Sequence, residues 1–193
     1  MPRILRHIPN LITLIRIAAV VPIAASLLHL EFETTLTVFV IAAASDGLDG
    51  FIARRFGWQS LLGSILDPIA DKLLLATVFV TLAVLNLVPT WLMAAAIARD
   101  LIIVAGAAAY RFVIGPLTAQ PSMVSKINTL CQAAFVLCVV ARAAFSQPPG
   151  WVEAWLGALA FATTVVSGID YVMTYGRRAV AAHDARGAHG SRP

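Results

Sequence analysis

The sequence predicts an all-α integral membrane protein, with six transmembrane helices that follow a short N-terminal amphipathic segment. Of its 193 residues, 60% are hydrophobic and 12% are charged, whereas soluble domains carry about 25% charged residues. The mean hydropathy is +0.85. The apolar residues form long runs separated by polar turns, and each run approaches the roughly 20 residues that a helix needs to cross a bilayer.

The first half of the chain predicts an interfacial segment and three helices. Residues 1–8 mix basic and apolar side chains, as in a segment that lies on a membrane surface. Helices are predicted over residues 11–29, 34–55 and 61–85. Because the linker between the second and third helices is short, we expect these two to form a tight antiparallel hairpin.

The second half predicts three further helices, over residues 90–112, 123–145 and 151–175. Turns rich in Pro, Gly and Ser separate them. Residues 181–193 are polar and rich in small side chains, which is typical of a disordered tail. Residues 1–180 are therefore predicted to form one membrane domain, with no room for a separate soluble catalytic domain.

Basic residues predict the orientation. In a six-helix arrangement the turns on one side hold only Arg142, and the other basic residues of the turns and termini fall on the opposite side. These residues are Arg3, Arg6, Arg54, Arg55, Arg111, Lys126, Arg177, Arg178, Arg186 and Arg192. By the positive-inside rule, both termini and the functional site face the cytoplasm, or the equivalent matrix side of an organelle. The interpretation is an integral protein of a bacterial inner membrane.

Four aspartates interrupt the apolar sequence of the second and third predicted helices. Asp46 and Asp49 are three residues apart, and Asp67 and Asp71 are four apart, so each pair projects from one face of its helix. An unpaired carboxylate at membrane depth costs several kcal/mol. Single charges of this kind often reach the membrane surface from a helix end, but four at helical spacing predict a functional site.

Carboxylates that converge in a medium of low dielectric constant repel one another unless cations hold them ionised. Ligands that are all oxygen atoms favour hard ions, so the pattern predicts two Mg²⁺ or Mn²⁺ ions. Gly50, Ala53 and Gly63 leave room for a ligand near the backbone, and Arg54 offers a planar guanidinium suited to phosphate oxygens.

These residues fit the pattern D-x2-D-G-x2-A-R-x8-G-x3-D-x3-D without exception. Its positions are Asp46, Asp49, Gly50, Ala53, Arg54, Gly63, Asp67 and Asp71. The chain thereby resembles the CDP-alcohol phosphatidyltransferase family. The resemblance implies a homodimer of six-helix subunits and transfer of a phosphatidyl group from CDP-diacylglycerol to an alcohol, with release of CMP.

The resemblance also implies roles for individual residues. The four aspartates are expected to bind the two divalent cations, and Asp71 is expected to act as the general base as well. Gly50, Ala53, Gly63 and Arg54 are expected to bind CDP-diacylglycerol. Asn10 and Thr13 belong to a Pro-Asn-x2-Thr-x2-Arg opening that is similar to the start of bacterial and mitochondrial members, and they are expected at the same site.

The acceptor alcohol is predicted from the later helices. The segments at 98–106, 121–132 and 175–180 are similar to eukaryotic-type cardiolipin synthases, which use phosphatidylglycerol. Phosphatidylglycerophosphate synthases, which use glycerol 3-phosphate, remain the alternative. They more often show Arg-Glu at 99–100 and a Gly-Lys-x-Lys-Thr-like pattern at 125–129. Both acceptors carry a phosphate, and the candidate residues for binding it are Arg99, Arg111 and Lys126.

Other charges inside the predicted spans leave alternatives open. Arg16 either extends to the membrane surface or belongs to the site. Arg99 and Asp100 are adjacent, and adjacent residues do not share a helix face, so we do not expect a simple mutual pair. A cation transporter remains a distant alternative function. No basic patch interleaved with aromatic residues indicates a nucleic-acid partner.

Overall fold

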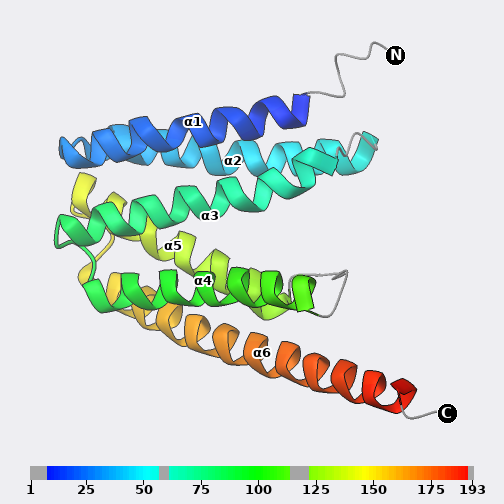
Figure 1. Ribbon diagram of the computed structural model, residues 1–193. Coiled ribbons are helices and arrows are strands. Elements are labelled where there is room, and N and C mark those ends of the chain that lie inside the picture. Colours follow the sequence, from blue (N-terminus) through cyan, green and yellow to red (C-terminus); the bar gives the residue numbers. More distant parts are fainter. Residues whose placement is uncertain (1–7, 57–60, 114–121, 191–193) are drawn as a thin grey trace.

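The computed structural model describes the backbone of residues 8–56, 61–113 and 122–190, and the side chains of residues 13–45, 69–108 and 122–174. The described backbone is helical apart from short turns (Figure 1). The helices are α1 (Ile8–Leu28), α2 (Phe32–Phe56), α3 (Leu61–Val84), α4 (Thr90–Val113), α5 (Met123–Phe145) and α6 (Gly150–Gly190). All six predicted helices are present, and most boundaries agree within three residues. The predicted interfacial segment lies outside the described residues except for Ile8.

The last helix differs most from the prediction. Helix α6 extends to Gly190 rather than ending near Tyr175, so residues 181–190, which we expected to be disordered, have a helical backbone. Alanine, the strongest helix former, is the commonest residue in this stretch, and no proline interrupts it. The boundary of the membrane domain at residue 180 remains a prediction.

Three helical segments are long and apolar enough to cross a bilayer, among the residues whose side chains are described. They are Thr90–Ala108, Met123–Phe145 and Gly150–Thr174. Thr13–Leu28 and Phe32–Ser45 are apolar but shorter, partly because the description of side chains stops within α1 and α2. The protein is thus all-helical and has the character of a membrane protein, while the number of six spans remains a prediction.

The helices form two groups of three. Helix α1 packs against both α2 and α3, and α6 packs against both α4 and α5. Contacts between α2 and α5 join the groups, with smaller contacts from α3 to α4 and α5. In their described parts, α2 and α3 make no close backbone contact with each other, and the expected hairpin contacts beside the linker lie outside the description and stay a prediction. In the described parts, α1 offers both helices an apolar partner.

The apolar core lies toward the end of the bundle where α1 meets α2 and α3 meets α4. Its largest fully buried side chains are Ile23 and Leu27 of α1, Val78, Phe79 and Leu82 of α3, and Val136 and Val140 of α5. The rings of Phe79 and Phe135 pack with their centroids 6.1 Å apart. Since these contacts hold one end of the bundle together, polar residues can lie between the helices toward the other end.

Candidate active site

The aspartate motif lies where α2 ends and α3 begins, at the end of the bundle opposite the apolar core (Figure 1). The backbone is helical at all four positions, so each pair keeps the spacing that places it on one helix face. Of the four, only Asp71 has a described side chain. The predicted site residues whose side chains lie outside the description are Asp46, Asp49, Asp67, Gly50, Ala53, Arg54, Gly63 and Asn10. Convergence of the four carboxylates therefore remains a prediction.

Asp71 is held by an arginine of the first helix. Arg16 Nη1 donates to Asp71 Oδ1 at 2.8 Å, and this ion pair connects α1 to α3. Arg16 is 4% exposed, so its side chain runs through the protein rather than to the membrane surface. Thr13, one turn earlier on the same helix, is also buried. The structure thus places Arg16 at the predicted site, and a charge that the sequence left ambiguous becomes a contact of the predicted base.

The donor set of the motif suits divalent cations. Four carboxylates offer only oxygen ligands, the preference of Mg²⁺ and Mn²⁺. The side chain of Asp71 is 40% exposed although its partner Arg16 is buried, so this carboxylate can be reached from outside the helix packing. Within the part of the chain whose side chains are described, no three His, Cys, Asp or Glu residues form a cluster. The metal site would therefore depend on Asp46, Asp49 and Asp67.

A second buried arginine connects the other group of helices. Arg99 of α4 is 4% exposed. Its Nη2 donates to Ser125 Oγ of α5 at 2.6 Å, and its Nε donates to Ser167 Oγ of α6 at 3.2 Å. Its Nη1 donates to Asp100 Oδ1 at 2.5 Å, which contradicts our expectation that these neighbours would not pair. The arginine side chain is long and flexible enough to reach the neighbouring carboxylate on its own helix. The expectation considered only the direction in which each side chain leaves the helix.

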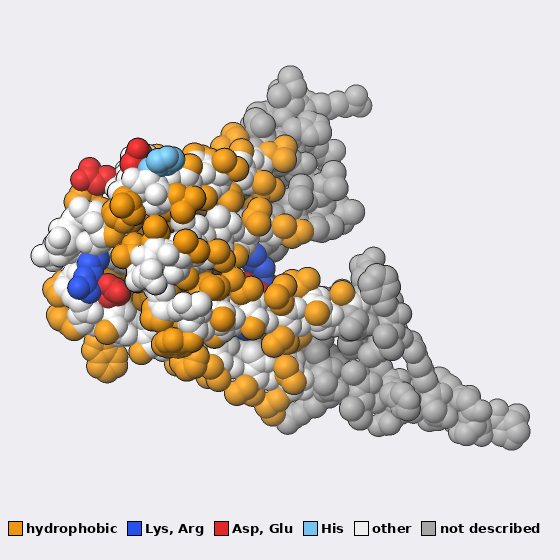
Figure 2. All heavy atoms as spheres, turned by 60° about the vertical axis from the view of Figure 1, so that its left-hand side comes forward, with side chains coloured by type: hydrophobic (Ala, Val, Ile, Leu, Met, Phe, Trp, Pro, Cys, Tyr) orange, Lys and Arg blue, Asp and Glu red, His pale blue; other side chains and the backbone are white. Residues whose placement is uncertain are grey.

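Asp100 also contacts the group formed by α1, α2 and α3. Lys72 Nζ of α3 donates to the same carboxylate oxygen at 2.9 Å. The pair lines a cleft of about 350 Å³ between α3 and α4, beside apolar residues of both helices and Gln132 of α5. Figure 2 shows a hollow between the two groups, with basic and acidic side chains at its inner end. Two cations thus share one carboxylate where the groups diverge.

The contact between α5 and α6 is also polar. Gln132 Nε2 donates to Thr164 Oγ1 at 2.9 Å, and the hydroxyls of Thr163 and Thr164 lie 3.0 and 2.9 Å from Asn128 Oδ1. Asn128 is fully buried, and its Nδ2 has no hydrogen-bond partner among the described residues. The sequence analysis did not single out Ser167 or the two threonines of α6, although hydroxyl residues at helical spacing in an apolar span were an available signal.

The three predicted acceptor-phosphate residues differ in their surroundings. Arg99 is buried with two serines and Asp100, whereas Lys126 is exposed on α5. Arg111 lies in α4, and its side chain is outside the description. A phosphate site built from these three residues therefore remains a prediction.

These features define a class of helical membrane protein with paired acidic residues on two adjoining helix ends. A family model described as CDP-alcohol phosphatidyltransferase matches residues 6–166. The chain belongs to this family. The match contains the whole aspartate motif, together with Arg16, Arg99 and the polar face of α5.

Curated proteins similar to the chain fall into two groups. The cardiolipin synthase (CMP-forming) of Rattus norvegicus is 33% identical over 189 residues, which cover 90% of this chain and 62% of the rat protein. The human protein of the same name is 32% identical with the same coverage. The CDP-diacylglycerol–glycerol-3-phosphate 3-phosphatidyltransferase of Bacillus subtilis is 30% identical and is covered to 93% of its length. The chain thus spans about three fifths of the length of the two cardiolipin synthases.

Proposed function

We propose that this protein transfers a phosphatidyl group from CDP-diacylglycerol to the hydroxyl group of phosphatidylglycerol, giving cardiolipin and CMP. The observation that carries the proposal is the aspartate motif on helical backbone, with Asp71 bonded to the buried Arg16. The family supports the reaction type, and the two mammalian relatives support the acceptor.

In this reaction, different residues of the chain bind the nucleotide lipid, accept the proton and position the base. Arg54 binds pyrophosphate oxygens of the nucleotide lipid, and Gly50, Ala53 and Gly63 leave space for it. Asp71 accepts the proton of the acceptor hydroxyl as that oxygen bonds to the phosphorus of the phosphatidyl group. The bond from this phosphorus to the oxygen of CMP breaks, and CMP leaves with the bonding electrons. Arg16 keeps the Asp71 carboxylate in place during the transfer.

Asp46, Asp49, Asp67 and Asp71 would hold two divalent cations, Mg²⁺ or Mn²⁺. When bound, such ions supply positive charge close to the pyrophosphate and make CMP a better leaving group. The support for this assignment is the oxygen-only donor set, its spacing on helical backbone and the partial exposure of Asp71.

The proposal includes a homodimer in a bacterial inner membrane, with the active site and both termini on the cytoplasmic side. The family resemblance supports the homodimer, and the distribution of basic residues supports the orientation. Large apolar side chains exposed on α4 and α6, among them Leu101, Val104, Val166 and Ile169, support a bilayer surrounding.

Phosphatidylglycerophosphate synthesis is the second candidate. It is favoured by the Bacillus subtilis relative, whose length the chain nearly covers. A second observation is a match to the corresponding Pseudomonas fluorescens enzyme, 42% identical over 80 residues. In this case glycerol 3-phosphate would take the place of phosphatidylglycerol, and the roles proposed for Asp71 and Arg16 would be the same.

Product analysis tests the proposal. Purified protein receives CDP-diacylglycerol, Mg²⁺ or Mn²⁺, and either phosphatidylglycerol or glycerol 3-phosphate, and the lipids are identified by mass spectrometry. We expect cardiolipin and an equal amount of CMP from the first acceptor, and no lipid product from the second. Phosphatidylglycerophosphate from glycerol 3-phosphate alone would establish the second candidate. Absence of CMP with either acceptor would contradict both.

A further inference from the structure

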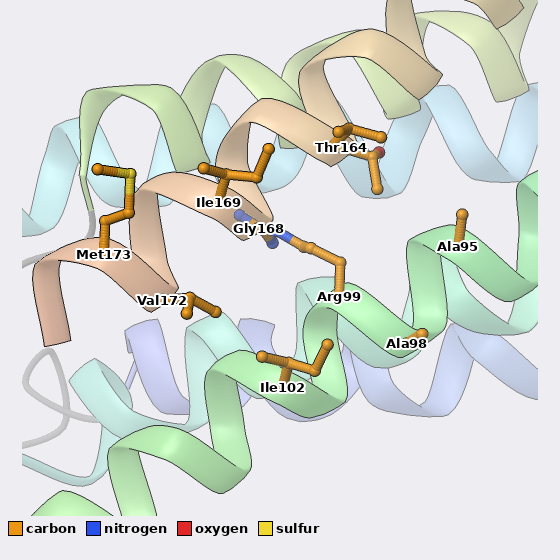
Figure 3. A pocket seen from close by; sticks show the side chains of 10 residues that line it. Ala95, Ala98, Arg99, Ile102, Thr164, Gly168, Ile169, Val172 and Met173 are labelled. Atoms are coloured by element: carbon orange, nitrogen blue, oxygen red, sulfur yellow. The ribbon is translucent and has the colours of Figure 1, made fainter. Parts of the chain in front are cut away.

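A lipid-facing groove lies between α4 and α6. It has a volume of about 390 Å³, within the range of small-molecule sites. Its walls include Ala98 and Ile102 of α4 and Ile169 and Val172 of α6, and Arg99 is the charged residue in its lining. Figure 3 shows the Arg99 side chain extending from α4 toward α6 near Gly168. The groove is distinct from the α3/α4 cleft that holds Lys72 and Asp100.

Contacts made by aromatic residues set the spacing between α4 and α6. Trp91 of α4 and Phe161 of α6 pack edge to face with ring centroids 5.0 Å apart. Farther along both helices, the hydroxyl of Tyr171 donates to the Ile103 carbonyl at 2.8 Å. These contacts flank most of the groove along the two helices. Since they fix the spacing of α4 and α6, the groove is preformed.

A missing side chain keeps the groove open. A Cβ atom added at Gly168 would meet only Arg99 Cγ, at 3.8 Å, which is ordinary van der Waals contact. The opposite wall on α4 includes the small side chains of Ala95 and Ala98. There is therefore room for apolar atoms from another molecule directly above the stem of Arg99.

The groove faces the hydrocarbon of the bilayer. Both walls belong to segments long enough to span a membrane, Thr90–Ala108 and Gly150–Thr174, and only 17% of each span is buried inside the protein. Ile102 and Ile169 are 48% and 55% exposed. A hydrocarbon chain therefore matches the accessible apolar walls of this groove.

The stem of Arg99 lines the groove, and its guanidinium lies beneath the surface in contact with Ser125, Ser167 and Asp100. Arg99 and Lys72 share the single carboxylate of Asp100, and the other described partners of Arg99 are neutral serine hydroxyls. This set of described side chains therefore carries one positive charge in excess. An uncompensated charge within a membrane span is costly, and a bound anion removes that cost. An apolar groove with a net positive charge beneath it is complementary to an anionic phospholipid.

We propose that the α4/α6 groove binds an acyl chain of the acceptor lipid, with phosphatidylglycerol as the occupant and Arg99 as the nearest cation to its phosphate. The inference rests on the proposed function, because a water-soluble acceptor such as glycerol 3-phosphate has no acyl chain to place there. The groove thereby explains how the enzyme takes its second substrate from the membrane.

A matched pair of tryptophan substitutions tests the groove. Ile169 lines it and Val166 does not, yet both lie on α6 and both are 55% exposed. We expect Ile169→Trp to raise the KM for phosphatidylglycerol about tenfold or more, which corresponds to about 1.4 kcal/mol, because the larger side chain occupies the groove. The KM for CDP-diacylglycerol should stay within twofold. Val166→Trp should leave both constants unchanged, and equal effects of the two substitutions would overturn the proposal.

Photo-crosslinking provides a readout that does not depend on turnover. Unmodified protein is irradiated with phosphatidylglycerol that carries a diazirine in one acyl chain, and the adducts are mapped by mass spectrometry. We expect adducts within residues 95–102 and 164–173 that unlabelled phosphatidylglycerol removes and phosphatidylcholine does not. Adducts confined elsewhere, or equal competition by phosphatidylcholine, would overturn the proposal. So would crosslinks showing that a second copy of the chain fills the groove.

The two proposals fail in different ways. If the protein makes cardiolipin but the labelled lipid reacts elsewhere, the groove assignment is wrong and the proposed function stands. If only glycerol 3-phosphate is used, the proposed acceptor is wrong, and the groove assignment is overturned with it.

Discussion

Each of the two groups of helices encloses a buried arginine. The two arginines differ in their partners, and this difference indicates different roles. Arg16 connects α1 to α3 through Asp71, a carboxylate that the proposed reaction requires and that remains 40% exposed. Arg99 connects α4 to α5 and α6 through serine hydroxyls, and shares Asp100 with Lys72. The first arginine therefore contacts the proposed base, whereas the second joins three helices and leaves an excess of positive charge.

The largest effect should come from Asp71→Asn. We expect CMP release to fall about 10³-fold, since a general base contributes roughly 10²–10⁴ and this residue is also a proposed metal ligand. The asparagine oxygen can still accept a hydrogen bond from Arg16, so the protein should remain folded, as judged by size-exclusion chromatography in detergent.

The matched control for Asp71→Asn is Glu153→Gln. Glu153 forms the other described arginine–acid pair between two helices, with Arg142 at 3.0 Å, near the turn that joins α5 to α6. Its loss should leave turnover within twofold. Substantial CMP release by Asp71→Asn would show that Asp71 is not the general base.

Arg16→Gln should have the next largest effect. We expect kcat to fall about 10²-fold, within the range that misplacement of a catalytic group produces, with little change in the KM for CDP-diacylglycerol. Arg16→Lys should recover part of kcat because a lysine can reach the same carboxylate. Steady-state kinetics of both variants, beside Arg142→Gln, give the measurement.

A merely structural arginine at position 16 would behave differently. Loss of folded protein in proportion to loss of activity, with no recovery by lysine, would show that Arg16 stabilises the α1–α3 contact and does nothing further for Asp71.

Arg99→Met should show the smallest of these effects on kcat, should raise the KM for phosphatidylglycerol as expected for the cation nearest the acceptor phosphate, and should lower stability. It leaves the half-buried hydroxyl of Ser125 and the buried hydroxyl of Ser167 without their cationic donor, at a cost of about 2 kcal/mol. We expect a lower unfolding temperature in detergent by circular dichroism. Lys126→Met, at an exposed position, should change stability by less than about 0.5 kcal/mol. Equal shifts for both variants would contradict the bridging role of Arg99.

The helices could be predicted from the sequence because each is a local property. Apolar runs of sufficient length, separated by Pro, Gly and Ser, place five of the six helices within about three residues at each end. The C-terminal extension of α6 was missed because polar composition was taken as a sign of disorder, while the helix propensity of its alanines was given too little weight. The motif was found because it too is local, with helical spacing that aligns its members.

Helix neighbours could not be predicted in the same way. A short linker suggested that α2 and α3 pair, yet in their described parts α1 packs against both. The pairing of Arg99 with Asp100 was likewise missed, since face geometry describes where a side chain leaves the helix and a long side chain can turn back.

The sequence by itself determined an all-helical, membrane-type chain with a four-aspartate motif, because composition and spacing along a helix depend only on neighbouring residues. Only the tertiary structure decided that Arg16 binds Asp71, that Arg99 joins α4, α5 and α6, and that a groove remains between α4 and α6. The physical reason is that each of these contacts joins residues far apart in the chain. Their formation depends on how apolar helix faces pack, which spacing within one helix does not specify.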